Sequence, residues 1–70
     1  MLLISRSFNV RLTEQPFSLA KGEKKTYGRF DLNKKYAVLG IFGNDAYTDF
    51  LLTDEDKIFH WVSSEICRKA

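Results

Sequence analysis

Two apolar segments separated by a turn signal, Tyr36–Phe42 and Tyr47–Thr53, constrain the fold of this chain more than any other feature. Gly43 and Asn44 lie between them, and both residue types favour tight turns. Two runs rich in aromatic and aliphatic side chains on either side of a short turn predict a β-hairpin. The first run is apolar on both faces, so we expect it to be covered on both faces. One of its faces holds Tyr36, Val38 and Phe42, and the other holds Ala37, Leu39 and Ile41.

The length of the chain limits how stable it can be on its own. Its 70 residues make one small domain. Such a domain buries only about 60% of its unfolded surface, so it needs an efficient core, a cross-link or a partner subunit. Cys67 is the one cysteine and His60 the one histidine, which excludes an internal disulfide and a four-ligand zinc site of Cys and His. We therefore expect no metal and no cofactor, and either tight aromatic packing or self-association, for instance as a homodimer.

The sequence contains no candidate for a membrane-spanning helix. It has no run of 18 apolar residues, whereas a transmembrane helix needs about 20. The apolar start, residues 1–4, is too short for the core of a signal peptide. A single thiol fits a reducing compartment. We therefore expect a cytoplasmic protein that does not bind membranes.

An alternation of apolar and polar residues near the N-terminus predicts the first strand, because a period of two is typical of a half-buried strand. Residues 13–29 follow as a predicted long loop or insertion within a single domain, 1–70. We expect Phe17 and Leu19 to anchor this loop to the core and residues 21–25 to form an exposed turn. The apolar face of the first strand comprises Leu2, Ile4, Phe8, Val10 and Leu12.

The rest of the chain predicts further strands and turns. Residues 26–32 are a weaker strand candidate, in which Gly28 indicates a bulge or a close approach of the backbone. Residues 33–35 and 54–57 are predicted turns, and a strand over residues 58–62 follows the second one. Ser63 can cap a short helical turn over residues 64–68. These elements predict a mainly β domain with a short C-terminal helical turn.

Three short motifs resemble those of small SH3-like β-barrel proteins common in bacterial and phage genomes. That group has a Gly-Lys-x-Tyr-x-Val block, an acidic Asp-Asp-x-Gly turn, and an aromatic strand that leads into a closing turn. Residues 33–38, 54–57 and 60–63 are similar to these motifs, with Asn33 and Lys57 where the group has glycine. The resemblance covers about residues 30–67 and the first strand. It implies a five-stranded antiparallel SH3-like barrel or strongly curved sheet, and it brings no catalytic residues.

Patterns for catalysis and metal binding are weak in this sequence. Cys67 and His60 could pair as nucleophile and base, but nothing in the sequence orients them. The acidic turn fails the pattern of a calcium-binding loop, because the sixth position counted from Asp54 is Phe59 rather than glycine. No phosphate-binding glycine motif is present. We therefore expect a protein that is not an enzyme.

Basic and acidic residues are concentrated in different halves of the chain, and such a separation can steer partners. The basic segment 21–35 also contains aromatic residues, a combination that small barrels use to bind single-stranded nucleic acid. The acidic second half would repel phosphate, so we keep nucleic-acid binding as the alternative hypothesis. Its candidate residues are Lys21, Lys24, Lys25, Tyr27, Arg29, Lys34 and Lys35.

The main hypothesis is a small interaction module that binds a host or self protein. It rests on more apolar residues in the central hairpin than a small monomer needs to bury. A phage- or mobile-element-type accessory protein is the form that we expect, and an inhibitor whose acidic turn mimics nucleic-acid phosphates is one version of it. The candidate protein-binding residues are Leu39, Ile41, Phe50, Trp61, Asp54, Glu55 and Asp56.

Overall fold

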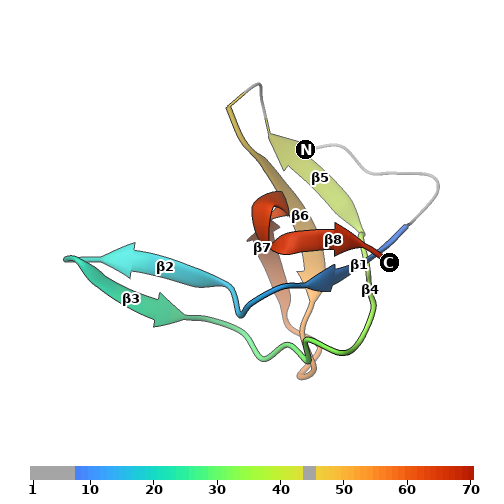
Figure 1. Cartoon of the computed structure of the whole chain (residues 1–70), viewed down its shortest axis with the longest axis horizontal. Helices are drawn as coiled ribbons and strands as arrows, with labels where there is room; N and C mark the ends of the chain where they lie inside the picture. Colours follow the sequence, from blue (N-terminus) through green and yellow to red (C-terminus); the bar gives the residue numbers. More distant parts are fainter. Residues whose placement is uncertain (1–7, 44–45) are drawn as a thin grey trace.

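A computed structural model describes residues 8–43 and 46–70 of the chain (Figure 1). The start of the predicted first strand, including Leu2 and Ile4, lies outside the described residues. So do Asn44 and Asp45 in the predicted hairpin turn. The described part is built from short strands and one 3₁₀ turn, η1. Their bounds are β1 Asn9–Leu12, β2 Phe17–Ala20, β3 Glu23–Thr26, β4 Tyr36–Ala37, β5 Gly40–Gly43, β6 Thr48–Thr53, β7 Phe59–Ser63, η1 Ser64–Ile66 and β8 Cys67–Lys69.

The strands form three small antiparallel sheets. Their orders are β4-β1-β8, β2-β3 and β5-β6-β7. The predicted mainly β fold is therefore confirmed. The more detailed prediction, a five-stranded barrel, is not: the described residues form eight strands, and the three sheets do not close into one barrel.

The segment that was predicted as one strand, residues 36–42, is split between two sheets. Val38 donates its backbone N–H to Phe8 O at 2.9 Å, whereas the next residue, Leu39, donates to Leu51 O at 2.9 Å. The chain thus leaves the β1 sheet and enters the β6 sheet at this point, and a strict alternation of faces cannot continue through it. The prediction that Phe42 shares a buried face with Tyr36 is therefore wrong, because Phe42 is 46% exposed.

The core lies between the two three-stranded sheets. Six of its eight buried apolar side chains come from strands, whereas Phe30 lies in the connection before β4 and Val38 in the connection between β4 and β5. Val38, Leu52 and Val62 are fully enclosed. Phe8, Ile41, Phe50 and Ile66 pack against this cluster from its margins. Burial of such aliphatic and aromatic side chains contributes about 1.5–3 kcal/mol each to folding. The buried apolar residues are Val10, Leu12, Phe30, Tyr36, Val38, Leu52, Val62 and Cys67.

The predicted long loop contains a regular hairpin, which we call the arm (residues 17–26). β2 and β3 pair along their whole length, from Phe17 opposite Thr26 to Ala20 opposite Glu23. Lys21 and Gly22 between them have positive φ angles of 53° and 78°, which a two-residue type I′ hairpin turn requires. The arm points away from the two larger sheets (Figure 1). The prediction that Leu19 anchors this segment to the core is wrong, since its side chain is 71% exposed.

The C-terminal residues close the β1 sheet. Ser63 caps η1 as predicted, with its Oγ accepting the N–H of Glu65 at 3.2 Å. η1 is shorter than the predicted helical turn, and β8 begins at Cys67 and pairs with β1. The weak strand predicted over residues 26–32 is absent beyond Thr26. Residues 33–35 and 54–57 lie outside the strands, as the predicted turns require.

Candidate functional site

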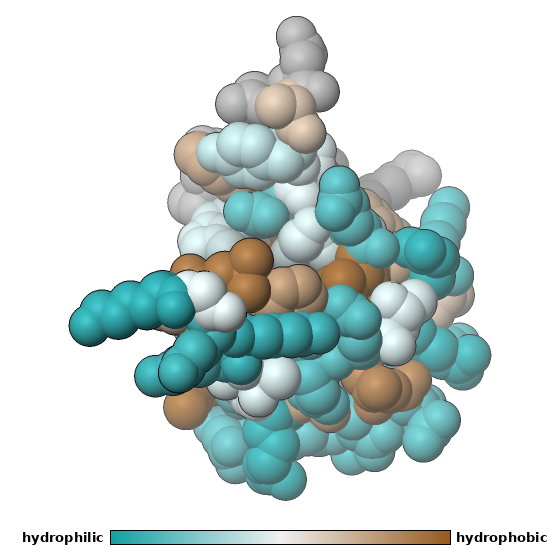
Figure 2. Space-filling view, turned by 60° about the vertical axis from the view of Figure 1, so that its left-hand side comes forward, coloured by the Kyte–Doolittle hydropathy of each residue, from teal (hydrophilic) through white to brown (hydrophobic). Residues whose placement is uncertain are grey.

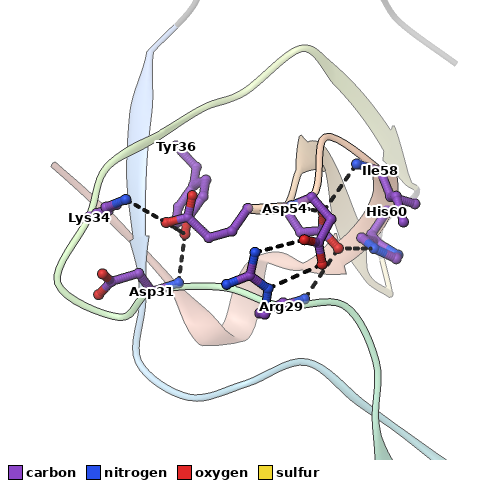
Figure 3. Close-up of polar contacts among 9 residues, drawn as sticks. Arg29, Asp31, Lys34, Tyr36, Asp54, Ile58 and His60 are labelled. Carbon is purple, nitrogen blue, oxygen red and sulfur yellow. Dashed lines mark hydrogen bonds and ion pairs between the residues drawn. The ribbon is translucent and has the colours of Figure 1, made fainter.

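Asp54 is the centre of a polar network that joins the acidic turn to the connection before β4 (Figure 3). Its side chain is 2% exposed. Oδ1 accepts the backbone N–H of Asp56 at 2.8 Å and that of Ile58 at 3.1 Å. Oδ2 accepts the N–H of Arg29 at 3.2 Å and lies 2.9 Å from His60 Nε2. The turn is therefore organised around a buried carboxylate.

These contacts determine the acidity of Asp54. Burial alone would raise the pKa of the carboxyl, since it disfavours the charged form. The hydrogen bonds from Ile58, His60, Asp56 and Arg29 act in the opposite direction and lower the pKa to about 2. Asp54 is thus a carboxylate at neutral pH that is satisfied by protein donors.

The other two acidic residues of the turn are paired with basic residues of the first half of the chain. Arg29 Nη2 lies 2.7 Å from Asp56 Oδ1 and Nε donates to Asp56 Oδ2 at 3.1 Å, a bidentate pair. Lys34 Nζ lies 2.8 Å from Glu55 Oε1. The hydrogen bond from Lys34 lowers the pKa of Glu55, and that from Arg29 lowers the pKa of Asp56.

Two further hydrogen bonds complete the attachment. The Tyr36 hydroxyl accepts the N–H of Asp31 at 2.6 Å and donates to Glu55 Oε1 at 3.3 Å. The backbone N–H of Glu55 donates to Arg29 O at 2.8 Å. A depression of about 530 Å³ lies over this region and is lined by Arg29, Phe30, Asp31, Lys34 and Glu55. Four of those five side chains are charged, and Arg29, Lys34 and Glu55 already have partners of opposite charge.

These ion pairs join acidic residues that were candidates for protein binding to basic residues that were candidates for nucleic-acid binding. Asp54, Glu55 and Asp56 were predicted as a protein-binding or phosphate-mimicking surface, and Arg29 and Lys34 as nucleic-acid contacts. The structure brings the two sets together. Glu55 and Asp56 are each paired with a basic residue and Asp54 is buried, so the network attaches the acidic turn to the connection before β4.

Gly28 allows the chain to pass close to His60. Its φ is 73°, and a Cβ at this position would lie 2.9 Å from the Phe30 ring and 3.0 Å from the His60 ring. This is the close backbone approach that the sequence predicted. His60 also packs beside Tyr27 and Phe30, with ring centroids 5.6 and 5.9 Å away. The imidazole therefore sits in an aromatic setting and is oriented by Asp54.

The pairing of Cys67 with His60 that was considered for catalysis is not formed. Cys67 is buried, its Sγ donates to Ser63 O at 3.5 Å, and burial raises its pKa to about 11. A thiol in this state is a poor nucleophile at neutral pH. Among the residues that the structure describes, no group of three or more His, Cys, Asp or Glu side chains is arranged to hold a metal ion.

A row of large apolar side chains is exposed on the outer face of the β5-β6-β7 sheet. The register places Gly40 opposite Leu51 and Leu51 opposite Trp61, so Leu51 and Trp61 share one side of the sheet. Phe42 and Phe59 fall on that side by alternation, and the Phe42 and Trp61 rings lie 6.0 Å apart. Phe42, Phe59 and Trp61 are 46%, 62% and 37% exposed. We call Phe42, Leu51, Phe59 and Trp61 the outer face.

The candidate protein-binding residues are divided between the two sides of this sheet. Trp61 belongs to the outer face, and Leu39 is 38% exposed at the point where the chain changes sheets. Ile41 and Phe50 pair with each other on the opposite side and pack against the core. The expectation that Ile41 points outward is wrong, because the split at Val38–Leu39 reverses the alternation. Phe50 also makes an edge-on contact with Phe8 at 5.6 Å.

Sequence reasoning did not identify Phe42 or Phe59 as exposed. The signal that was available is the alternation of side chains along a strand. Once Val62 is placed in the core, its neighbour Trp61 must point outward, and so must Phe59, which lies two residues before Trp61. To place Phe42 on the outer face, one would also have to know that the chain changes sheets at Val38–Leu39.

The remaining nucleic-acid candidates lie mainly on the arm. Lys21 is in its turn, and Lys24 and Lys25 are on β3, whose residues are all exposed. Lys24 Nζ lies over the Phe17 ring, 4.2 Å from its centroid. Tyr27, the aromatic residue among these candidates, is half-buried at the base of the arm, and its hydroxyl donates to Trp61 O at 2.9 Å. Lys35 is exposed before β4.

A groove of about 180 Å³ lies between the base of the arm and η1. Its apolar floor includes Phe17 and Ile66, and it contains two carboxylates, Glu14 and Glu65. The other lining residues are Pro16, Tyr27 and Ser63.

No family model, curated protein or solved structure matches this chain. In the part of the chain that the structure describes, no helix is long and apolar enough to cross a membrane.

Proposed function

We propose that this protein is a non-enzymatic interaction module that binds another protein through its outer face. The observation that carries the proposal is the set of three aromatic side chains, Phe42, Phe59 and Trp61, left 37–62% exposed on one side of a three-stranded sheet. Tryptophan and other aromatic residues dominate the binding energy of protein interfaces. Monomeric proteins rarely leave contiguous apolar patches of more than a few hundred Å² uncovered.

The surroundings of the outer face support a protein partner over a small ligand. The face is an open sheet surface rather than an enclosed cavity, whereas small molecules are bound in concave pockets. Asp49 lies opposite Phe42 on this same side and is partly buried. Charged groups beside aromatic anchors are typical of the polar margin of a protein interface. A partner with apolar side chains and a nearby basic group fits this surface best.

The partner is proposed to be a host protein or a second copy of the chain, and the setting to be a phage- or mobile-element-type accessory protein. The proposed phage- or mobile-element-type setting rests on the resemblance to small SH3-like proteins. We also propose that the two larger sheets are an opened form of that architecture. The passage of one chain segment, residues 36–43, from the β1 sheet to the β6 sheet supports this, as does the short 3₁₀ turn before the last strand.

The test compares the chain with a Trp61→Ser variant in a capture experiment from host lysate, followed by titration of the captured protein. We expect Trp61→Ser to weaken binding by at least tenfold, since interface tryptophans often contribute 2 kcal/mol or more. Leu32→Ser is the matched control, because Leu32 is similarly exposed (38%) but lies in the turn before β4. Equal binding by both variants and the unmodified chain would reject the outer face as the binding surface.

Nucleic-acid binding through the arm is the second candidate function. The observation in its favour is that Lys21, Lys24 and Lys25 are exposed on a hairpin that projects from the body (Figures 1 and 2). Figure 2 brings the arm toward the viewer and shows mostly hydrophilic side chains on that side. Fluorescence anisotropy with a labelled single-stranded oligonucleotide over a salt series measures nucleic-acid binding. Binding should weaken with salt and be lost in Lys24→Glu/Lys25→Glu, and absence of binding at low salt excludes this function.

A further inference from the structure

The arm has two free edges, because the β2-β3 sheet contains no third strand within the described residues. An isolated two-stranded hairpin is marginally stable in water, and an open strand edge is a template for pairing with another chain. We propose that β2 of one molecule pairs antiparallel with β2 of a second copy, so that the two arms form one four-stranded sheet. This surface is separate from the outer face, and the inference does not depend on the proposed function.

The backbone of β2 offers groups for such pairing. In an antiparallel ladder, residues alternate between pointing their N–H and C=O toward one neighbour and toward the other. Tyr27 donates its N–H to Pro16 O at 3.0 Å, which fixes the alternation along the arm. Ser18 and Ala20 therefore direct their backbone groups toward β3, and Phe17 and Leu19 direct theirs to the free edge. The free edge carries two donors and two acceptors in each molecule.

These groups specify one register. Antiparallel strands related by a two-fold axis satisfy all of them when Phe17 of each copy lies opposite Leu19 of the other, with the two Ser18 residues facing each other at the axis. The pairing forms four backbone hydrogen bonds. It also makes one continuous apolar strip, because Phe17 and Leu19 share a face of β2.

The sequence of the arm favours the β2 edge over the β3 edge. β2 reads Phe-Ser-Leu-Ala and carries no charge, whereas β3 reads Glu-Lys-Lys-Thr. Self-pairing of β3 about a two-fold axis would bring lysines of the two copies together, and lysine on an edge strand is a common device against such pairing. Lys24 additionally covers the Phe17 ring on the β3 side. Of the two free edges, β2 is therefore the one suited to self-pairing.

Charge at the ends of the arm is complementary in the same register. Continuing the pairing beyond β2 brings Lys21 at the tip of one arm to the level of Glu14 and Gln15 at the base of the other. Glu14 lines the groove at the base of the arm, together with Glu65 and the apolar side chain of Ile66. The basic tip of each molecule thus meets the acidic base of its partner, and this contact occurs twice in the symmetric dimer.

The first experiment is cross-linking by an introduced cysteine. Ser18→Cys places two thiols opposite each other in a pair without backbone hydrogen bonds, where side chains are closest, and we expect an intermolecular disulfide on mild oxidation. Lys25→Cys is the matched control: it pairs with Ser18 across the hairpin but lies on the other edge. We expect it to cross-link at least tenfold more slowly. The native Cys67 is buried and stays in both variants. Equal rates for the two variants would overturn the proposed pairing.

The second experiment removes one backbone donor of the proposed intermolecular pairing while keeping the hairpin within each molecule. Leu19→Pro deletes an N–H that points to the free edge, and Leu19→Thr keeps it while losing the same apolar side chain. Sedimentation velocity should show a dissociation constant for Leu19→Pro at least tenfold higher than for Leu19→Thr. Circular dichroism and thermal unfolding check that both variants are folded. A monomer at millimolar concentration for the unmodified chain, or equal dimerisation of both variants, contradicts the proposal.

The charged ends provide an independent check. Lys21→Glu and Glu14→Lys should each weaken the dimer several-fold, and the double variant should restore it, because the pair is rebuilt with reversed signs. Failure of the double variant to restore dimerisation would reject the register. Trp61→Ser should leave the cross-linking rate of Ser18→Cys unchanged, because that disulfide reports the pairing of the arms alone, and this separates the result from the test of the outer face.

Discussion

The acidic turn and the arm both carry many charged residues, but these residues are buried or paired in the acidic turn and exposed on the arm. At the acidic turn, Asp54 is buried, and Glu55 and Asp56 are paired with Lys34 and Arg29. On the arm, every residue of β3 is exposed, and the segment projects from the body. The comparison shows that charge counted along a sequence is not the charge that a partner meets. The acidic turn uses its charge to hold the fold together, whereas the arm keeps its charge available.

The comparison also separates the two halves of the basic segment. Arg29 and Lys34 follow the arm in sequence but belong to the polar network, because the chain returns to the body at Gly28. Lys21, Lys24 and Lys25 precede that return. A test of nucleic-acid binding should therefore change the arm lysines, since replacing Arg29 or Lys34 would also break the attachment of the acidic turn.

The largest effect is expected from Asp54→Ala. Removal of the carboxylate leaves four donors without an acceptor in a site that is nearly closed to water, and buried unsatisfied donors are strongly destabilising. Thermal unfolding should show a much larger loss of stability for Asp54→Ala than for Asp56→Ala, because the Asp56 side chain is 51% exposed. Exposed ion pairs contribute little. If the two variants unfold at the same temperature, the acidic turn is not organised around Asp54.

Gly28→Ala should have the next largest effect. The added Cβ meets the Phe30 and His60 rings at 2.9–3.0 Å, and alanine disfavours a φ of 73°. Strain of this kind costs about 1–3 kcal/mol, which denaturant unfolding can measure. Gly22→Ala is the control, because Gly22 has a similar φ of 78° but nothing within 4 Å of its Cβ. A larger loss for Gly22→Ala than for Gly28→Ala would show that the close packing at His60 is unimportant.

Much of the fold follows from local patterns, and the failures have physical causes. The strand at 58–62, the cap at Ser63 and the turns at 33–35 and 54–57 depend on neighbouring residues, so the sequence predicted them. The split at Val38–Leu39 depends on which strand each residue meets, namely Phe8 or Leu51. Local alternation carries no such information. The arm was missed because its type I′ turn places Lys21, a residue with no special preference for positive φ, before Gly22.

The candidate site was predicted less well, for a related reason. Trp61 was identified as a candidate because an aromatic residue beside the apolar hairpin is conspicuous, and the structure leaves its side chain 37% exposed. The pairing of Arg29 with Asp56 joins residues far apart in the sequence, and only the folded chain shows that each neutralises the other. Charge patterning alone therefore overstated both the acidic and the basic surface.

Acid should weaken the contribution of the acidic turn to stability. The pKa of Asp54 in the folded protein is about 2, below its ordinary value of 3.8, so the unfolded chain takes up a proton first as the pH falls. The stabilisation is complete above about pH 4 and is lost between pH 4 and pH 2. Glu55 and Asp56, whose pKa values are also lowered by Lys34 and Arg29, act in the same direction. Thermal unfolding over a pH series should show this loss, and Asp54→Asn should show a smaller pH dependence over the same range.

The smallest effect on stability is expected from Lys24→Glu/Lys25→Glu. Both side chains are exposed on a segment that projects from the core, and such substitutions usually change the free energy of unfolding by less than about 0.5 kcal/mol. Lys24 contacts the Phe17 ring, which itself lies at the margin of the body, so its loss is small as well. Denaturant unfolding measures the effect, with Lys35→Glu as a control at an exposed lysine outside the arm. A loss as large as that of Gly28→Ala would mean that the arm supports the fold. A near-zero loss means that the charge of the arm contributes little to the stability of the body.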